Sequence, residues 1–351
     1  MDETNEHRRR ARYRGTHPRT FAEKYKELNP EHYAGEVAKV MARGDTPAGS
    51  HRPIMVAEIL QALQPRPGEI AVDGTLGFGG HTRALLTAIA PGGRLYGLDV
   101  DPLELPKAER RLRAEGFTPA VFHACRTNFA ALPRLLVEEG IPGVDIFLAD
   151  LGVSSMQMDN PARGFTFKRN GPLDLRMNPD KAAPAAKLLE TISEEKLARL
   201  LRENADEPYA EEIARILTSR RGAITTTTAL ADAVRAALGQ LPATARAEAG
   251  DDPIRRTFQA LRIAVNQEFS ALETLLHVLP DCLNPGGRAA ILTFHSGEDR
   301  RVKRAFEDGL ARGHYAAIAP AVLRPTPEER HTNPRASSAK LRWAVKGPVT
   351  V

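Results

Sequence analysis

The feature that most constrains the fold is a glycine-rich string between an apolar run and a stretch of helical composition. Residues 72–81 read VDGTLGFGGH. Gly77, Gly79 and Gly80 allow the backbone to turn sharply and to approach a ligand closely, and the next helix would offer unpaired N–H groups there. Such a string is typical of the first strand-to-helix turn in an α/β sheet that binds a nucleotide-like ligand. A plain structural turn is the alternative.

Short apolar runs then alternate with stretches of helical composition, which predicts an α/β fold with a parallel sheet and helices on both faces. The predicted strands are 70–76, 94–98, 119–123, 144–149 and 288–294, with a further edge strand at 340–345. The helices predicted between the first four strands are 82–90, 102–115 and 130–139.

The alternation stops after Asp150. Residues 160–255 contain no convincing strand but favour helices at 194–203, 209–220 and 229–238, and one long helix is predicted at 256–283. We therefore expect an all-helical domain inserted into the sheet domain. The expected parts are a basic N-terminal extension at 1–50, the sheet domain at 51–159 and 256–351 with a basic C-terminal tail, and the insert at 160–255.

Charge and composition narrow the possible environments. The 351 residues hold 49 Lys and Arg against 44 Asp and Glu, and this net charge of +5 permits a polyanionic partner without requiring one. No apolar run approaches the roughly 20 residues of a bilayer span, and the N-terminus does not resemble a secretory signal, so we expect a cytoplasmic protein. Cys125 and Cys282 lack a CxxC spacing, and the histidines are scattered, so we expect no metal site.

Acidic and aromatic residues follow the other predicted strands. Asp99 ends the second strand roughly 20 residues past the glycines, where a carboxylate can accept hydrogen bonds from ribose hydroxyls. Asp101 is its rival, or else a helix cap. Phe129 is placed to stack on an adenine or to serve as an ordinary core residue, and Asp150 ends the fourth strand. A dinucleotide fingerprint would need glycine where Thr82 stands, which argues against a nicotinamide-dependent dehydrogenase.

Several longer strings resemble the ribosomal RNA small subunit methyltransferase H family. They are HRPI at 51–54, DGTLGFGGH at 73–81, DLGVSS at 150–155 with Gln157 and Asp159, RGFTF at 163–167, GPLDLRM at 171–177, FQALRIAVN at 258–266, and FHS at 294–296 followed by EDR at 298–300. The resemblance covers about residues 51 to 306, in order.

The resemblance implies a Rossmann-like class I S-adenosylmethionine-dependent methyltransferase whose helical insert handles the RNA substrate. The implied reaction is methylation of the N4 amine of a cytidine in the decoding region of 16S rRNA, within the small ribosomal subunit. No membrane partner is expected. DNA is not expected either, because the Asp/Asn-Pro-Pro-aromatic string of DNA amino-methyltransferases is absent after the fourth strand. The oligomeric state, monomer or homodimer, stays open.

The resemblance and the glycine turn together also suggest the site residues. The expected cofactor-binding residues are Gly77, Gly79, Gly80 and His81 near the methionine moiety, Asp99 at the ribose, Phe129 at the adenine, and Asp150 and Gln157 beside the cofactor. Asp150 and Ser154 are the candidate acceptors of a hydrogen bond from the target amine. Asp174 and His295 are secondary catalytic candidates that would position base or phosphate; a structural ion pair and a structural hydrogen bond are their alternatives.

The chain also departs from the family pattern. Gly297 replaces a leucine in the usual FHSLED string, ENADEP at 203–208 stands in place of a GEER-like string, and the basic arm is extra. None of these changes falls in the cofactor loops, so they bear on the target more than on the cofactor. Two alternatives follow: a methyltransferase acting on a different RNA nucleotide, or a non-catalytic RNA-binding ribosome-assembly factor.

Overall fold

Seven strands form one sheet in the order β3-β2-β1-β4-β5-β7-β6. The computed structural model describes residues 53–348, so the predicted basic arm and the first two residues of the HRPI string lie outside the described residues. The strands are β1 (Ile70–Asp73), β2 (Arg94–Asp99), β3 (Phe122–Arg126), β4 (Val144–Asp150), β5 (Leu283–Thr293), β6 (Tyr315–Ile318) and β7 (Lys340–Lys346). The first five pair in parallel, and β7 runs antiparallel to β5 and β6.

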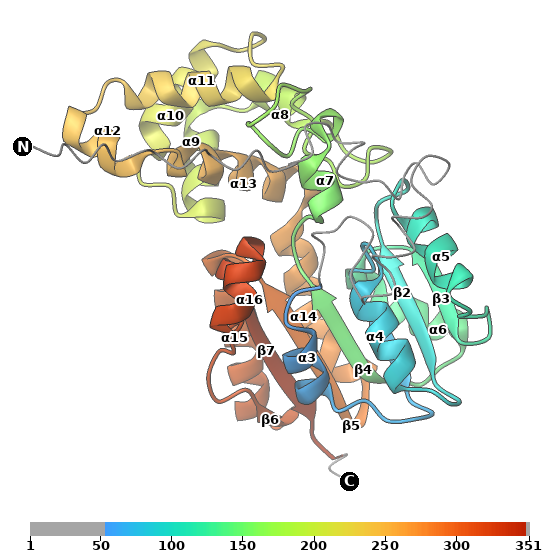
Figure 1. Cartoon of the computed structure of the whole chain (residues 1–351). Helices are drawn as coiled ribbons and strands as arrows, with labels where there is room; N and C mark the ends of the chain where they lie inside the picture. The colour runs from blue at the N-terminus through green and yellow to red at the C-terminus, as the bar shows by residue number, and fades with distance from the viewer. Residues whose placement is uncertain (1–52, 349–351) are drawn as a thin grey trace, which may run out of the picture. The chain divides into compact units, whose positions relative to one another are not determined.

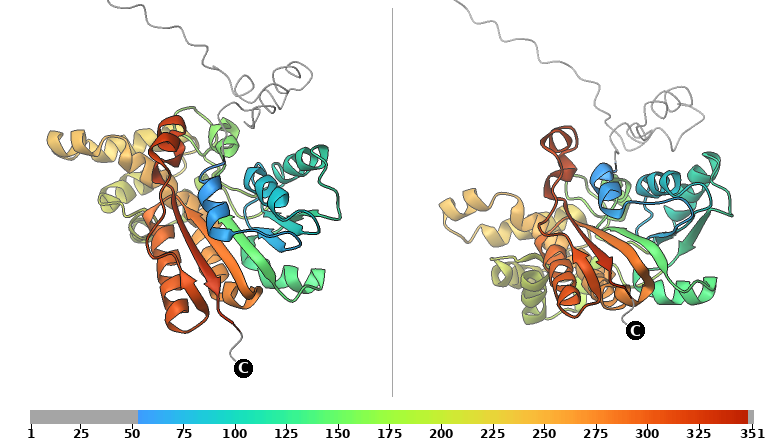
Figure 2. Two further views of the ribbon diagram at one scale, coloured as in Figure 1. Left: turned by 60° about the horizontal axis from the view of Figure 1, so that its bottom comes forward. Right: turned by 90° about the horizontal axis from the view of Figure 1, so that it is seen from below.

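Helices cover both faces of the sheet, as the alternation predicts. One face packs against α6 (Leu132–Glu139), α14 (Glu268–Cys282) and α15 (Ser296–Ala311), and the other against α3 (Val56–Leu63), α4 (Gly80–Ala88) and α5 (Leu105–Ala114). Figure 2 shows the sheet between these two layers. The predicted Rossmann-like α/β class is confirmed, and the strand order reverses between β1 and β4, where such sheets bind ligands.

The run of helices after β4 has a hydrophobic core of its own. It contains α8 (Ala185–Thr191), α9 (Glu194–Ala205), α10 (Ala210–Ser219), α11 (Thr227–Leu238), α12 (Ala243–Ala249) and α13 (Asp252–Asn266). The helices predicted at 194–203, 209–220 and 229–238 are confirmed as α9, α10 and α11. Phe258 and Leu261 of α13 belong to this same core, so the packed cluster extends past residue 255. It lies on the side of the carboxyl ends of the parallel strands (Figure 1).

The string that replaces the GEER-like motif connects this helical cluster to helix α15, which packs on the sheet. Asp206, the left-handed C-cap of α9, accepts hydrogen bonds from Arg300 at 3.0 Å on both carboxylate oxygens and from Ser296 Oγ at 2.9 Å. The neighbouring Glu207 is buried and accepts a 2.7 Å hydrogen bond from Arg256 Nε. The departure from the family pattern therefore has a structural function here.

Several predicted elements were wrong in their bounds. The helix predicted at 256–283 is divided into α13 and α14 at Gln267, whose φ of 53° interrupts the helical backbone while Arg262 pairs with Glu268 across the corner. The strand predicted at 119–123 lies at Phe122–Arg126, because Val121 and Phe122 both donate to the Thr118 carbonyl in a turn before it.

Two further elements begin at other residues than predicted, and several elements were not predicted at all. Helix α5 begins at Leu105 rather than at Pro102, and β5 begins at Leu283, opposite Val144, rather than at Arg288. Strand β6 and helix α3 were not predicted, nor were the short elements α7 (Ser155–Asp159), η3 (Pro161–Arg163), α16 (Pro327–Thr332) and η4 (Pro334–Ser338). Within residues 53–348, no helix is both long and apolar enough to cross a bilayer.

The corner at Gln267 predicts opposite effects for two glycine substitutions. Gln267→Gly relieves a left-handed backbone that side chains disfavour by roughly 1 kcal/mol, so it should leave stability unchanged or raise it by up to about 1 kcal/mol. Ser270→Gly, at an exposed position inside α14, should lower stability by about 0.5 kcal/mol. Urea unfolding midpoints measure both. A clear loss of stability in Gln267→Gly would contradict the corner.

Candidate functional site

The candidate site lies at the carboxyl ends of β1, β2, β3 and β4, where the glycine string crosses the edge of the sheet. Gly74 N–H donates to the Leu148 carbonyl at 2.7 Å, and Leu76 N–H donates to the Leu98 carbonyl at 2.8 Å. These two bonds tie the string to β4 on one side and to β2 on the other. The string therefore bridges the switch point of the sheet.

The glycines occupy positions that a side chain would strain. Gly77 and Gly79 have φ values of 49° and 85°, in the left-handed region. A Cβ on Gly80, the first residue of α4, would come within 2.3 Å of the Pro53 Cγ. Between these glycines, the Phe78 ring lies under the Arg111 guanidinium at 3.4 Å, and Arg111 donates to the Phe78 carbonyl at 2.9 Å. Helix α5 thus holds the loop in place.

Asp99 faces this loop from the end of β2. Its Oδ2 accepts the Gly77 N–H and its Oδ1 accepts the Asp101 N–H, both at 2.9 Å. Burial raises the pKa of Asp99 to about 6, although these two hydrogen bonds act against the shift. A carboxylate has about four lone-pair positions, so two remain for ligand hydroxyls. The geometry suits a ribose diol.

Asp73, at the end of β1, links the string to Asp150. Its buried carboxylate accepts the Thr82 hydroxyl at 2.6 Å and the Thr75 N–H at 3.0 Å. The Thr75 hydroxyl in turn accepts the Asp150 N–H at 2.6 Å. In the sequence, Thr82 mattered only because it stands where a dinucleotide fingerprint has glycine. In the structure, its hydroxyl donates a hydrogen bond to the buried Asp73 carboxylate.

Asp150 pairs with His81 across the site. The His81 Nδ1 lies 3.5 Å from Asp150 Oδ2, and the His81 Nε2 lies 2.9 Å from the Ile54 carbonyl. Because a carbonyl only accepts, Nε2 carries the hydrogen in this arrangement, and the Nδ1 lone pair faces Asp150. The two groups are therefore placed to share one proton.

Asp150 itself is only partly satisfied by the protein. Its Oδ1 is buried and has no hydrogen-bond partner within residues 53–348. Burial raises the pKa of Asp150 to about 6; a protonated His81 would lower it, and the negative charges of Asp73 and Glu298 raise it. The side chain nevertheless keeps 28% of its surface exposed. Rotation about its soft χ2 exchanges the two oxygens, so either can meet a donor from a ligand.

Ser154 and Gln157 are engaged with each other and with the protein. Ser154 caps α7: its hydroxyl accepts the Gln157 N–H at 3.2 Å, and the Gln157 Oε1 accepts the Ser154 N–H at 2.9 Å. The Gln157 amide also donates to Asp101 Oδ2 at 2.7 Å. Asp101 is fully buried and accepts the Leu103 N–H as well, so it acts as a cap and anchor rather than as a rival for the ribose.

Phe129 lies beside the string. It begins the short η2 helix (Phe129–Ala131), whose start is capped by the Asn128 side chain. The Phe129 Cβ lies 3.1 Å from where a Cβ on Gly74 would be, and the ring is half-buried against the α6 face. It therefore sits at the end of β3, next to the switch point.

Asp174 and His295 bond mainly within their own segments. The Asp174 carboxylate receives Arg176 Nε at 2.7 Å and Nη2 at 2.8 Å, and this pairing holds the pKa of Asp174 below its usual range although burial acts to raise it. His295 caps α15, with its Nε2 3.1 Å from Glu298 Oε1. His295 follows β5 at the same edge as Asp150, whereas Asp174 belongs to the loop that leads to the helical cluster.

Two further residues act near the site, and sequence reasoning did not select them. Asn266, at the end of α13, accepts the Met177 N–H at 2.7 Å and donates to the Leu175 carbonyl at 2.7 Å. Leu175 is buried at a left-handed φ of 64°, so this loop is held in an uncommon conformation. Arg163 donates to Asp101 at 2.8 Å. Their only signal in the sequence was membership of the strings FQALRIAVN and RGFTF.

Residues 53–348 bring together no three His, Cys, Asp or Glu side chains that could hold a metal ion.

Comparisons with known proteins agree with the strings noted above. The MraW methylase family matches residues 48–347. Ribosomal RNA small subunit methyltransferase H 1 of Lachnoclostridium phytofermentans is 50% identical over 343 residues, which cover 97% of this chain and 93% of that protein. Ribosomal RNA small subunit methyltransferase H 2 of Alkaliphilus metalliredigens is 49% identical over 350 residues, covering 99% and 100%.

Solved structures give more distant matches. TrmN from Thermus thermophilus has 14% identity and a TM-score of 0.38, covering 83% of this chain and 48% of that one. A SAM-dependent O-methyltransferase from Thermotoga maritima has 11% identity and a TM-score of 0.38, covering 89% and 71%.

The Thr75 bridge gives a direct test of the site's scaffold. Thr75→Val keeps the side-chain shape but removes the acceptor of the Asp150 N–H, so stability should fall by about 1–3 kcal/mol. Thr87→Val is the matched control, because its hydroxyl only bonds to the Arg83 carbonyl on the exposed side of α4; it should change stability by less than about 0.5 kcal/mol. Equal effects in urea unfolding would contradict the bridge.

Proposed function

Because this chain belongs to the MraW methylase family, we propose that it transfers a methyl group from S-adenosylmethionine to the N4 amine of a cytidine in the decoding region of 16S rRNA. The observation that carries the proposal is the near full-length identity of 50% to a protein named for small-subunit rRNA methylation. Relatives at this level cover both the sheet and the helical cluster, so the resemblance is not confined to the cofactor loop.

The site supports this choice of cofactor. Asp99 would hold the ribose hydroxyls, Phe129 would contact the adenine, and Gly77, Gly79, Gly80 and His81 would border the methionine moiety. The unpartnered Oδ1 of Asp150 fits a site whose last donor comes from a ligand. Gln157 supports the cofactor through Asp101 and Ser154, since its amide is already bonded to both.

Methylation of an exocyclic amine needs orientation and a proton acceptor. When bound, S-adenosylmethionine supplies an electrophilic methyl group on a cationic sulfur. Asp150 would accept a hydrogen bond from the N4 amine, which returns electron density to the nitrogen, and would then take the proton that the methylated amine releases. His81 Nδ1 lies 3.5 Å from Asp150 and can share this proton while Nε2–H remains bonded to Ile54.

The remaining candidates have supporting roles in this proposal. Ser154 keeps the turn after Asp150 in shape as the cap of α7, and Asp174 and His295 order the loops that would receive the target base. Burial raises the pKa values of Cys125 and Cys282 to about 11, so neither thiol is suited to act as a nucleophile. A direct transfer without a covalent enzyme adduct is consistent with this chemistry.

The two shifted carboxylates predict separable pH effects. Asp99 and Asp150 act as carboxylates and each has a raised pKa of about 6, so function should be retained above pH 6 and lost as pH falls through it. The Kd for S-adenosylhomocysteine should rise below pH 6 because of Asp99, and kcat at saturating cofactor should fall there because of Asp150. Calorimetry at a series of pH values on the parent protein and on Asp99→Asn checks the assignment. If the Kd of Asp99→Asn still rises below pH 6 as it does in the parent protein, the assignment is contradicted.

Asp150 can be tested against a second aspartate on the same strand. Asp150→Asn should lower kcat by at least about 100-fold, because an amide cannot take the proton. Asp145→Asn is the matched control, since Asp145 bonds to Ile70 and Asn284 at the far end of β4 and should leave kcat within about threefold. Activity is measured per folded molecule. Full activity in Asp150→Asn would remove its proposed role.

The substrate assignment is tested by mapping the product. Purified protein is incubated with labelled S-adenosylmethionine and small ribosomal subunits that lack native methylations, and the modified nucleoside is identified by mass spectrometry. We expect label on N4 of a cytidine in 16S rRNA. Label on another nucleotide would indicate a different RNA target, and no label despite subunit binding would indicate a non-catalytic assembly factor.

A further inference from the structure

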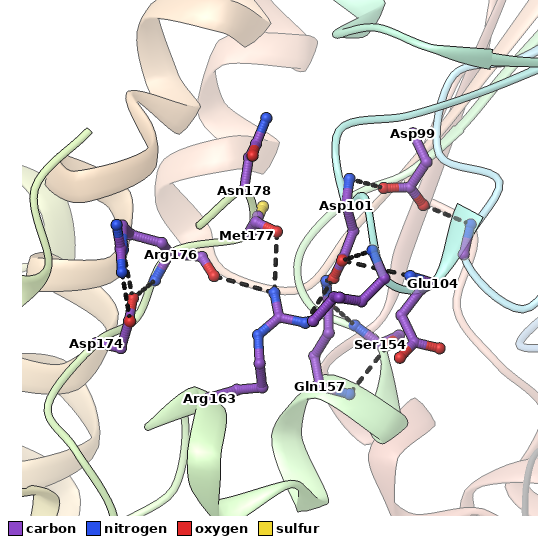
Figure 3. Close-up of polar contacts among 12 residues, drawn as sticks. Asp99, Asp101, Glu104, Ser154, Gln157, Arg163, Asp174, Arg176, Met177 and Asn178 are labelled. Atoms are coloured by element: carbon purple, nitrogen blue, oxygen red, sulfur yellow. Dashed lines mark hydrogen bonds and ion pairs between the residues drawn. The ribbon is translucent and has the colours of Figure 1, made fainter. Parts of the chain in front are cut away.

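Buried Asp101 joins the candidate cofactor site to the loop beyond α7. Its N–H donates to Asp99 Oδ1 at 2.9 Å, so its backbone is fixed against the proposed ribose acceptor. Its own Oδ2 accepts Gln157 Nε2 at 2.7 Å and Arg163 Nη1 at 2.8 Å. Figure 3 shows this carboxylate between its side-chain donors Gln157 and Arg163. An ion pair this deeply buried is stable only when its geometry is well satisfied.

Arg163 carries this connection onward. Its second terminal nitrogen, Nη2, donates to the Arg176 carbonyl at 3.0 Å and to the Met177 carbonyl at 2.9 Å (Figure 3). Its own carbonyl accepts the Leu175 N–H at 3.2 Å. One buried side chain therefore fixes Asp101 and two consecutive carbonyls, while its backbone fixes the residue before them. We call residues 174–178 the clamp segment.

The clamp segment is held at both ends of its span. Asn266 of α13 bonds to Leu175 and Met177 from the side of the helical cluster. Just past the segment, Asp180 pairs with Arg126 at the carboxyl end of β3, next to the residues that precede Phe129. The segment therefore runs between the helical cluster and the edge of the sheet where the proposed adenine site lies.

We propose that Arg163 is a positioning residue, which acts through the clamp segment to place the target nucleotide against the cofactor-loaded site. This inference rests on the proposed methyltransferase function. Arg163 is itself nearly buried, and both of its terminal nitrogens are bonded to protein acceptors. It acts by fixing the carbonyls of the clamp segment relative to Asp99. A shift of about 1 Å in such a segment is enough to slow a positioned reaction by roughly 100-fold.

Leu175 explains why this segment needs a dedicated support. Its left-handed φ of 64° is unusual for a side-chain-bearing residue, and it persists only where the surroundings fix it. Removing the two bonds from Arg163 Nη2 would leave Leu175 and Met177 with only Asn266 and the Arg163 backbone carbonyl as partners from outside the segment, and the backbone would relax toward ordinary conformations. The hydrogen bonds that Asp99 makes to Gly77 and Asp101 do not involve Arg163 Nη2.

The test is Arg163→Lys beside the matched control Arg288→Lys. Lysine keeps the charge opposite Asp101 but cannot also reach both carbonyls with one nitrogen. Arg288 has the same type of contacts at the opposite edge of the sheet: it pairs with Glu69 and donates to the Leu63 and Gln64 carbonyls. Melting temperature, the Kd for S-adenosylhomocysteine, and kcat on unmethylated small subunits are measured for both variants.

We expect kcat to fall roughly 10- to 100-fold in Arg163→Lys, with the Kd for S-adenosylhomocysteine within about threefold of the parent protein. Arg288→Lys should lower the melting temperature without lowering kcat per folded molecule. A kcat equal to the parent in Arg163→Lys, or an equal loss in both variants, overturns the positioning role. If the parent protein binds the cofactor and methylates cytidine while Arg163→Lys does so at full rate, only this inference fails; if the parent does neither, the proposed function fails with it.

A second variant keeps the test decisive if Arg163→Lys does not fold. The double substitution Asp101→Asn with Arg163→Gln removes both buried charges together, which proteins tolerate better than the loss of one partner. It also removes the two hydrogen bonds from Arg163 Nη2 to the Arg176 and Met177 carbonyls. A folded double variant should show the same loss of kcat at saturating cofactor, and full activity in it overturns the proposal.

Discussion

Three carboxylates end β1, β2 and β4 within one buried edge of the sheet, and the loops of the site follow from the need to satisfy them. Asp73 takes the Thr82 hydroxyl, Asp99 takes two backbone N–H groups, and Asp150 retains one buried oxygen without a partner in the described chain. The charge of Asp73 raises the pKa of both other aspartates. Three neighbouring aspartates favour a ligand that carries a positive charge, as the sulfonium of the proposed donor does.

The helical cluster and the sheet domain are joined at the same edge. Asp206 and Arg300 hold the helical cluster to α15, and Arg163 reaches from that side to Asp101. Each of these links involves a charged pair rather than an apolar seam. Such links fix direction better than they add stability. Solvent screens the half-exposed Asp206–Arg300 pair, and desolvation offsets much of the attraction within the buried Arg163–Asp101 pair. Their value lies in fixing the helical cluster relative to the candidate site at this edge of the sheet.

The sequence predicted what depends on local spacing and missed what depends on distant contacts. The glycine string and Asp99 were recognisable because a strand, a turn and an acid recur at fixed intervals in such sheets. The break at Gln267 was missed, since apolar periodicity continues across it and only the backbone angle and the Arg262–Glu268 pair reveal it. No local pattern marks the pairing of Asp101 with Arg163, so the support of the clamp segment emerged from the structure alone.

The central claim is that this carboxylate-lined edge seats the methyl donor. A crystal structure of the full chain with S-adenosylhomocysteine tests it most directly. The account predicts the ribose hydroxyls on Asp99, the adenine against Phe129 and the sulfur facing Asp150. A ligand bound elsewhere, or bound here with Asp99 and Asp150 both out of contact, would contradict it.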